Sequence, residues 1–372
     1  MTSPACAGER LLAARAIFGL SQKELAEEAG VSQPLISGIE RGTREATSAT
    51  LSRVASSLDV PLSFFYVAPQ EIPLDSLRFR KNVTAPRLVT RRVRALYSEA
   101  FRIADTLVDL GEYHRPKILA IAGGQILASP AIGDAAAATR SALLLDDAAP
   151  IPNVMRALER GGIPVAPIVP PEEYEDALTN AGHFGLSYWP GDGAPALIGY
   201  FPGHQGDRDR FTLAHELGHL VLHTHRRADD PELEANLFAG AFLMPRSRAQ
   251  TALSADLRLT DYARLKAVWG ISIQALIMRA HQIGVIDDAR RGSLFRQLTA
   301  RGWRRNEPVV VHPERPLLLR RLHDKLFEGQ SGAEVAEALA VPRLILRSLI
   351  PASGQPPKVH SRGTVTAITR KS

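Results

Sequence analysis

One helical segment constrains this chain more than any other feature of its sequence. Residues 210–223 read Arg-Phe-Thr-Leu-Ala-His-Glu-Leu-Gly-His-Leu-Val-Leu-His, and this segment is apolar on most of its faces. A helix that is apolar all round is normally buried in a folded core. The polar residues in its middle, His215, Glu216 and His219, therefore need a chemical reason to be there.

The spacing of these three residues predicts a zinc site. His215 and His219 are four residues apart, so both imidazoles project from one helix face and one zinc ion can bind both. Glu216 follows one step round the helix, where its carboxylate can reach a metal-bound water without being a ligand. A general base needs this placement, and we therefore expect Glu216 to be the catalytic residue.

A zinc hydrolase keeps three protein ligands and leaves a fourth position for water, so a third ligand is needed. The single cysteine, Cys6, excludes a thiolate cluster. A second helix is predicted over residues 232–245, on which Glu232 and Asn236 share one face. We expect Glu232 to bind the metal and Asn236 to support a ligand histidine, with Glu234 as the alternative ligand.

Other polar residues in this region are expected to have supporting roles. Candidates for stabilising an oxyanion are His183, Tyr188, Tyr200 and His204, for each of which a surface or packing role is the alternative. His223 and His225 are expected to cap the C-terminal end of the helix, where a positive charge suits the helix dipole. For the central group, a buried polar cluster or a noncatalytic metal site is the alternative.

These residues and their surroundings resemble a known family. The sequence from Arg210 to His223, followed by Glu-x-Glu-Ala-Asn-x-Phe-Ala and Leu-Met-Pro, closely resembles the ImmA/IrrE family of zincin metallopeptidases over about residues 150–285. The resemblance implies a compact zinc endopeptidase that acts on regulatory proteins, often repressors, in stress or mobile-element control. It also implies that His215, His219 and Glu232 bind Zn²⁺ and that Glu216 is the base.

The N-terminal segment has the pattern of a helix-turn-helix unit. Ser21 and Glu24 form a capping-box pattern that begins a helix running to about residue 28. Gly30 ends this helix, Ser32 caps the next one, and Gly42 closes it. Two short helices joined by a tight glycine turn are the helix-turn-helix arrangement, and further helices near residues 48–58 and after Pro61 would complete a five-helix core.

The same segment strongly resembles the Xre/lambda-repressor helix-turn-helix family over about residues 8–66, through Ser-Gln-Lys-Glu-Leu-Ala and Gly-Val-Ser-Gln-Pro-Leu-Ile-Ser-Gly-Ile-Glu-Arg-Gly. The resemblance implies that the third helix enters the major groove of DNA. Gln33 can bond adenine with its amide. The positions implied to contact bases or backbone are Gln22, Ser32, Gln33, Pro34, Ser37, Gly38, Arg41 and Arg44. The alternative is a helical module used only for protein contact.

Length and pattern together predict several domains in a mainly α fold with a small β-sheet (α+β). A chain of 372 residues is too long for one ordinary core. Short strands are predicted within residues 163–169, 184–189 and 196–201. The predicted ranges are a helix-turn-helix domain (1–70), a basic linker and helix (71–125), a zincin-like metallopeptidase domain (126–285), a helical C-terminal region (286–350) and a flexible tail (351–372).

The net charge of +6 is unevenly distributed. Residues 78–94 hold seven basic residues and no acid, and residues 290–372 hold sixteen basic and six acidic residues. Such runs can neutralise nucleic-acid phosphates, although solvated surface is the alternative. Because the sequence lacks a signal-peptide pattern, a disulfide framework and an apolar run of about 20 residues, we expect a cytoplasmic protein without a membrane span.

Two classes of function remain open. In the first, the chain is a DNA-binding regulator with a zinc endopeptidase that cleaves itself or a partner repressor, with a double-stranded operator as partner and a homodimer as a possible assembly. In the second, it is a transcription factor whose metallopeptidase-like domain is a noncatalytic metal or ligand sensor; a toxin-antitoxin role is a third alternative. The intact Glu216 favours the first, because a pure metal sensor has no need of a base beside its ligands.

Overall fold

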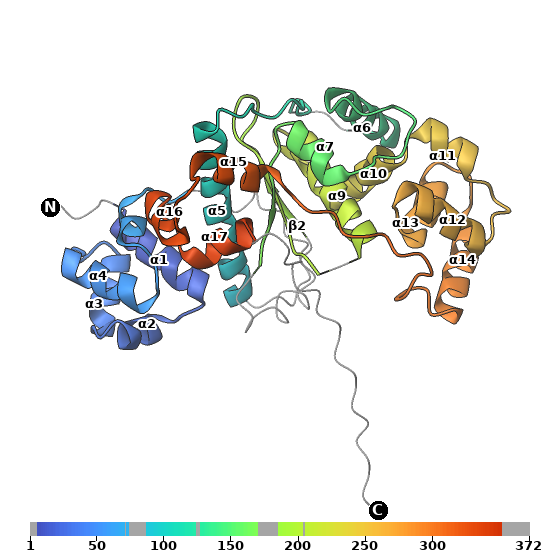
Figure 1. The fold of residues 1–372 in the computed structure, drawn as a ribbon. Helices are drawn as coiled ribbons and strands as arrows, with labels where there is room; N and C mark the ends of the chain where they lie inside the picture. The colour runs from blue at the N-terminus through green and yellow to red at the C-terminus, as the bar shows by residue number, and fades with distance from the viewer. Residues whose placement is uncertain are drawn as a thin grey trace, which may run out of the picture.

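The computed structural model describes residues 6–70, 72–73, 87–123, 127–169, 185–203 and 205–351. The expected mainly helical fold with a small sheet is confirmed. Figure 1 shows helices α1 to α4 at one end of the molecule, the sheet in the middle and α12 to α14 at the other end. No helix among the described residues is both long and apolar enough to cross a membrane.

The N-terminal helices follow the sequence prediction closely. The capping box of Ser21 and Glu24 is present, with each side chain accepting a bond from the other residue's backbone N–H. Gly30 and Gly42 have φ angles of 62° and 69°, a left-handed backbone that glycine adopts at least cost. The elements are α1 (Ala7–Phe18), α2 (Gln22–Glu28), α3 (Gln33–Glu40), α4 (Ser48–Ser57) and the 3-10 helix η1 (Leu62–Tyr66).

The sheet lies between two hydrophobic cores. Its strands are β1 (Val165–Pro167), β2 (Gly185–Tyr188) and β3 (Leu197–Tyr200), in the order β1-β3-β2, with β1 parallel and β2 antiparallel to β3. Successive side chains of a strand point to opposite faces. Leu197 accordingly packs into the core that contains the N-terminal helices, whereas Ile198 packs into the other core. All three strands fall within the predicted segments.

Helix α5 (Arg87–Leu110) packs against the first of these two faces. Its Tyr97 is fully buried and donates a hydrogen bond from its hydroxyl to the carbonyl oxygen of Leu197 in β3. A Cβ atom on Gly199 would lie 3.0 Å from the Tyr97 ring, so this glycine allows the helix to approach the sheet. Helix α5 also packs against α1, which joins the N-terminal helices to the sheet.

The core on the second face of the sheet is formed by helices from the middle of the chain, and the sequence did not predict all of them. Residues 126–152 gave no sharp signal, yet they contain α6, which packs on α10. This helix is rich in alanine, so it lacks the large apolar side chains that reveal helical periodicity. The helices are α6 (Ser129–Ala142), α7 (Val154–Arg160), α9 (Gly206–His223), α10 (Pro231–Leu243), α11 (Arg246–Ala252), α12 (Leu259–Trp269), α13 (Ile273–Gln282) and α14 (Asp288–Ala300).

The last three helices return to the N-terminal half of the molecule, as Figure 1 shows. Helices α15 (Leu318–Leu326) and α17 (Arg343–Leu349) pack on α5, and α16 (Gly332–Ala338) packs on η1. Helix α14 belongs to the other core. The helices within the range 286–350, which was predicted as one helical C-terminal region, are therefore divided between two cores. The predicted tail after residue 351 and most of the basic linker, residues 74–86, lie outside the described residues.

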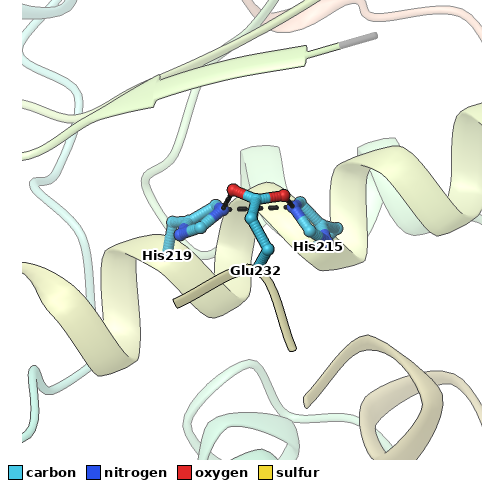
Figure 2. Close-up of side chains that lie close together, drawn as sticks. All are labelled: His215, His219 and Glu232. Atoms are coloured by element: carbon cyan, nitrogen blue, oxygen red, sulfur yellow. Dashed lines mark hydrogen bonds and ion pairs between the residues drawn. The ribbon is translucent and has the colours of Figure 1, made fainter. Parts of the chain in front are cut away.

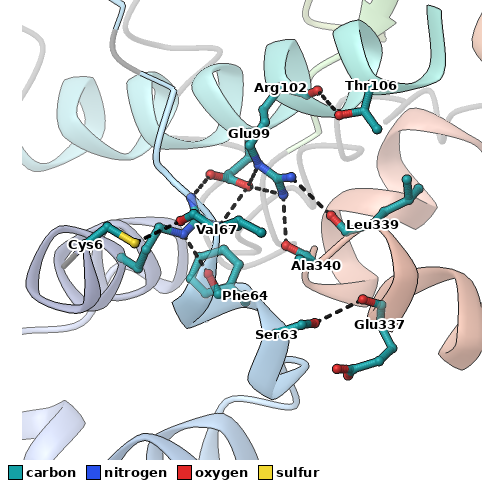
Figure 3. A network of polar contacts seen from close by, with 11 residues as sticks. Cys6, Ser63, Phe64, Val67, Glu99, Arg102, Thr106, Glu337, Leu339 and Ala340 are labelled. Atoms are coloured by element: carbon teal, nitrogen blue, oxygen red, sulfur yellow. Dashed lines mark hydrogen bonds and ion pairs between the residues drawn. The ribbon is translucent and has the colours of Figure 1, made fainter. Parts of the chain in front are cut away.

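A buried polar network ties the N-terminal helices, α5 and the C-terminal helices together (Figure 3). Arg10 of α1 is fully buried, forms an ion pair with Glu99 of α5, and donates from Nε to the carbonyl oxygen of Phe64 at 2.8 Å. Arg102 donates to Glu99 at 2.9 Å and to the carbonyl oxygens of Leu339 and Ala340 at 3.1 and 2.8 Å. The carboxylate of Glu99 thus balances the positive charge of two guanidinium groups that have little contact with water.

Replacing Glu99 should destabilise the protein strongly, because it leaves two buried guanidinium groups without their carboxylate. We expect Glu99→Gln to lower the free energy of unfolding by about 3–5 kcal/mol, measured by urea denaturation. In the exposed Lys23–Glu27 pair, whose side chains are 79% and 66% exposed, Glu27→Gln should have little effect. Equal losses in the two variants would contradict the assigned role of Glu99.

Candidate metal centre

Two helices bring three metal-binding side chains to one point. His215 and His219 lie on α9, and Glu232 lies in the first turn of α10. The two helices approach closely at Gly218, where an added Cβ would lie 3.1 Å from the Phe238 ring of α10. One possible ligand atom from each of His215, His219 and Glu232 lies within 4.8 Å of the other two, and Figure 2 shows the carboxylate between the imidazoles.

The separations between the ligand atoms suit a zinc ion. The Nε2 atoms of His215 and His219 are 3.1 Å apart, and each lies 3.4 Å from a carboxylate oxygen of Glu232. Tetrahedral zinc with ligands at roughly 2.0–2.1 Å separates its ligand atoms by about 3.4 Å. Two imidazoles and one carboxylate are also a donor set that zinc hydrolases use. The residues present therefore fit the metal that the sequence predicts.

Asn236 holds His215 in the orientation that metal binding needs. The Nδ1 atom of His215 lies 3.1 Å from Oδ1 of Asn236, which is on the same face of α10 as Glu232. An amide oxygen only accepts, so Nδ1 carries the proton and Nε2 keeps its lone pair for a metal. The position expected for Asn236 from its spacing to Glu232 agrees with this contact.

His219 is held by a longer polar chain that the sequence analysis missed. Its Nδ1 lies 3.0 Å from Nδ1 of His223, whose Nε2 lies 3.0 Å from Oε2 of Glu234, which in turn pairs with Arg226. If Nε2 of His219 is to bind metal, its Nδ1–H must donate to His223, and the Nε2–H of His223 must then donate to Glu234. In this chain of contacts His219 carries its proton on Nδ1 and His223 carries its proton on Nε2.

The expected role of His223 as a helix cap is wrong. Its side chain is 1% exposed and contacts a candidate ligand instead of the carbonyl groups at the helix end. The signal was available, because His223 follows His219 by the same four residues that separate His219 from His215. Glu234, the alternative ligand, forms an ion pair with Arg226 and lies outside the group of three candidate ligands.

Glu216 lies beside the candidate ligands and is not one of them, as its position on the helix predicts. It is buried, and Ser187 of β2 donates from Oγ to its Oε2 at 2.7 Å. Burial raises the pKa of Glu216, and the contact with Ser187 partly opposes the rise. Gly185 permits this approach of β2, because a Cβ there would lie 2.8 Å from Oε1 of Glu216. Sequence spacing gave no sign of Ser187 or Gly185.

Glu232 has the opposite electrostatic character to Glu216. Its partial burial disfavours the charged form, but hydrogen bonds and charges from His215 and His219 outweigh this and hold its pKa below the usual range. One carboxylate of the site is thus held ionised among the imidazoles, while the other has a raised affinity for a proton. This difference is the one expected between a metal ligand and a general base.

The structure describes two of the four candidates for an oxyanion donor, Tyr188 and Tyr200. Tyr188 lines a cavity of about 320 Å³ that extends from His219 along β2 and the end of α9, together with His225. Tyr200 is buried in β3, and burial raises the pKa of its hydroxyl. His183 and His204 lie outside the described residues.

The N-terminal site is built on α2 and α3. Gln33 donates from its amide to Oε1 of Gln22 at 2.9 Å, and Gln22 donates to Oε2 of Glu40 at 2.7 Å. Ser32 occupies the N-cap position of α3 without a side-chain cap bond. Figure 1 shows both helices at the edge of the molecule. The exposed candidates are Ser32, Gln33, Pro34, Arg41 and Arg44, and Gln22 and Ser37 are half-buried.

Gly38 departs from the expectation that it faces DNA bases. It is buried, and a Cβ on it would lie 2.8 Å from the side chain of Arg44. In this conformation Arg44 covers the position at which Gly38 was expected to contact bases. Of the residues of α3 expected to contact DNA, Gln33 and Pro34 are exposed and Ser37 is half-buried.

Two segments of the chain match models of known protein families. Residues 11–65 match the helix-turn-helix family model, and residues 178–281 match the IrrE N-terminal-like domain. The fold and the two matches thus describe a helix-turn-helix regulator with an attached domain that holds a candidate metal site. The chain combines a helix-turn-helix domain with an IrrE N-terminal-like domain, which agrees with both resemblances seen in the sequence.

Curated relatives match only a short part of the chain. An uncharacterised HTH-type transcriptional regulator of Mycobacterium tuberculosis is 29% identical over 83 residues, which are 22% of this chain and 59% of that protein. One from Sinorhizobium medicae is 34% identical over 59 residues, which are 16% of this chain and 42% of that protein. The chain spans about half the length of the relatives it matches, and their names support a DNA-binding regulator.

The first turn of α9 makes stability depend on pH. Burial, together with the charge of Asp207, raises the pKa of Asp209 to about 8. In the unfolded chain an aspartate ionises near pH 4, so the stability contribution of Asp209 is complete below that pH and is lost as pH rises to about 8. Asp209→Asn should therefore stabilise the protein more at pH 8 than at pH 5, measured by urea denaturation.

The exposed Asp59 supplies the control for this prediction. Asp59→Asn should have a small effect at both pH values. An effect of Asp209→Asn that is the same at pH 5 and pH 8 would contradict the prediction.

Proposed function

We propose that this protein is a DNA-binding transcriptional regulator whose IrrE-like domain is a zinc-dependent endopeptidase. It cleaves itself or a partner repressor in response to a stress or mobile-element signal. The observation that carries the proposal is the convergence of His215, His219 and Glu232 with Glu216 beside them. A metal site without catalysis needs the first three residues but does not need a buried carboxylate held by Ser187.

Each residue of the centre has a separate task in this proposal. His215, His219 and Glu232 would hold the zinc, which when bound supplies a Lewis acid that polarises a peptide carbonyl. Ser187 fixes one oxygen of Glu216 and leaves Oε1 to accept a proton from the attacking water. The same carboxylate then passes the proton to the departing amine. Burial raises the pKa of Glu216, which favours its acceptance of the proton from water.

In the DNA-binding half, α3 reads the operator. Gln33, Pro34 and Ser37 would contact base edges, and Gln33 is oriented by its bond to Gln22. Arg41 and Arg44 are exposed, follow α3 in the chain and would contact the DNA backbone. The partners are a double-stranded operator and a repressor protein, and this role places the protein in the cytoplasm with the chromosome.

Changing Glu216 to Gln tests the catalytic part directly. The variant removes the proton acceptor but keeps the size of the side chain and an oxygen for Ser187. We expect zinc content and DNA binding to stay unchanged, while cleavage of purified repressor substrates falls at least about 100-fold. Zinc is measured by elemental analysis and cleavage by mass spectrometry. Unchanged gene regulation in cells carrying Glu216→Gln would instead support the sensor alternative.

His223 should be needed for tight metal binding, because it orients His219 through Nδ1. We expect His223→Phe to weaken zinc affinity by about 10–100-fold, measured by competition with a chelator. Glu234→Gln keeps an acceptor for His223 and should weaken affinity less. His225→Phe alters an exposed histidine two residues further on and is the matched control. Equal zinc affinity in the His223 and His225 variants would contradict the assigned role.

A further inference from the structure

The C-terminal segment repeats the sequence of the helix-turn-helix at a constant offset of 310 residues. From residue 21 the chain reads Ser-Gln-Lys-Glu-Leu-Ala-Glu, and from residue 331 it reads Ser-Gly-Ala-Glu-Val-Ala-Glu. Val31 and Val341 follow at the same offset, just before the helices α3 and α17. The family model matches only residues 11–65, so nothing in the comparisons assigns this second copy.

The two segments also share their local structure. Helices α2 and α16 each have seven residues and begin with a capping box, formed by Ser21 with Glu24 and by Ser331 with Glu334. In the turns, the valine N–H donates across five residues to an alanine oxygen at 2.9 Å in both copies. Ala340, at the place of Gly30, takes the same left-handed backbone with a φ of 48°. Residues 331–350 are therefore a second helix-turn-helix unit.

Burial agrees with this equivalence. The residues that pack α2 and α3 together in the first unit correspond to buried residues in the second. These pairs are Leu25 and Val335, Ala26 and Ala336, Ala29 and Leu339, Ile36 and Leu346, and Ile39 and Leu349. The second unit thus keeps the core of the motif, so its exposed residues can be compared position by position with those of the first.

The exposed residues of the two units differ in charge. Gln33 and Ser37 of α3 correspond to Arg343 and Arg347 of α17, and both arginines are exposed. Four residues separate them, so they share one helix face. Arg347 has no ion pair within the part of the chain that the structure describes, and Arg343 only approaches Asp59, at 4.0 Å. The face of α17 that corresponds to the proposed base-reading face of α3 therefore carries two guanidinium groups.

Packing limits how the second unit can approach a duplex. Ser348 corresponds to Gly38, and its Oγ donates to the carbonyl oxygen of Pro167 at 3.1 Å and accepts from the N–H of Val169 at 3.2 Å. Part of α17 is thus fixed against β1 and is not free to enter a groove. The arginines remain outside this contact. This arrangement suits binding to phosphate groups, which needs positive charge without insertion.

We propose that α16 and α17 form a second DNA-contacting unit, in which Arg343 and Arg347 bind backbone phosphates of the duplex. The inference rests on the proposed DNA binding by α3 and extends it. The second unit adjoins the N-terminal domain that contains the first, since Ser63 of η1 donates to the carbonyl oxygen of Glu337 at 3.0 Å (Figure 3). Gln33 and Ser37 of the first unit offer an amide and a half-buried hydroxyl for base contacts. Arg343 and Arg347 of the second unit supply positive charge.

The salt dependence of DNA binding by the full chain tests the proposal. Each lost phosphate contact makes the slope of log K against log salt shallower by about 0.9. The double variant Arg343→Gln and Arg347→Gln should therefore have a slope shallower by about 1.8 than the wild type, measured by fluorescence anisotropy with a labelled mixed-sequence duplex. Both side chains are exposed, so the variant should fold normally.

Two further variants make every outcome decisive. Arg264→Gln changes an arginine that is 82% exposed on α12, and it should leave the slope unchanged. Arg44→Gln weakens the first unit. If Arg44→Gln weakens binding while the double variant has the wild-type slope, the second unit does not contact DNA and this inference fails alone. If the wild type does not bind the duplex at all, the proposed DNA binding and this inference fail together.

Discussion

The close packing of α9 on α10 is the constraint on which the candidate metal centre depends. The helices meet at Gly218, where the ring of Phe238 occupies the space that a side chain would need. Their approach brings Glu232 to 3.4 Å from each imidazole of His215 and His219. A larger residue at position 218 would separate the helices and, with them, the three ligands.

Polar contacts in a buried environment orient the side chains of the candidate centre. Asn236 and His223 each occupy the Nδ1 side of one candidate ligand, so both Nε2 atoms are directed to the same point. Because unpaired polar groups are costly when buried, these partners fix one arrangement of rings. Ser187 acts in the same way on Glu216. These contacts therefore orient the candidate ligands and Glu216 within the folded protein.

Helix α5 connects this centre to the helix-turn-helix domain. Tyr97 faces the sheet and lies close enough to Glu216 for that charge to add to the effect of burial in raising the tyrosine's pKa. Two residues later Glu99 pairs with Arg10 of the N-terminal domain, and Arg102 reaches the C-terminal helices. The helix-turn-helix domain, the C-terminal helices and the sheet beside the candidate centre thus share α5 as one buried support.

The sequence by itself determined what depends on neighbours along the chain: the capping boxes, the glycine turns, the four-residue spacing of His215 and His219, and the placement of Glu216 outside the ligand set. Glu232 and Asn236 were also found, because they share a helix face. Only the tertiary structure decided that β2 brings Ser187 to Glu216, that His223 is buried, and that α15 to α17 return to the N-terminal half. Local hydrogen bonds and periodicity specify elements, whereas contacts between distant segments depend on how whole surfaces pack.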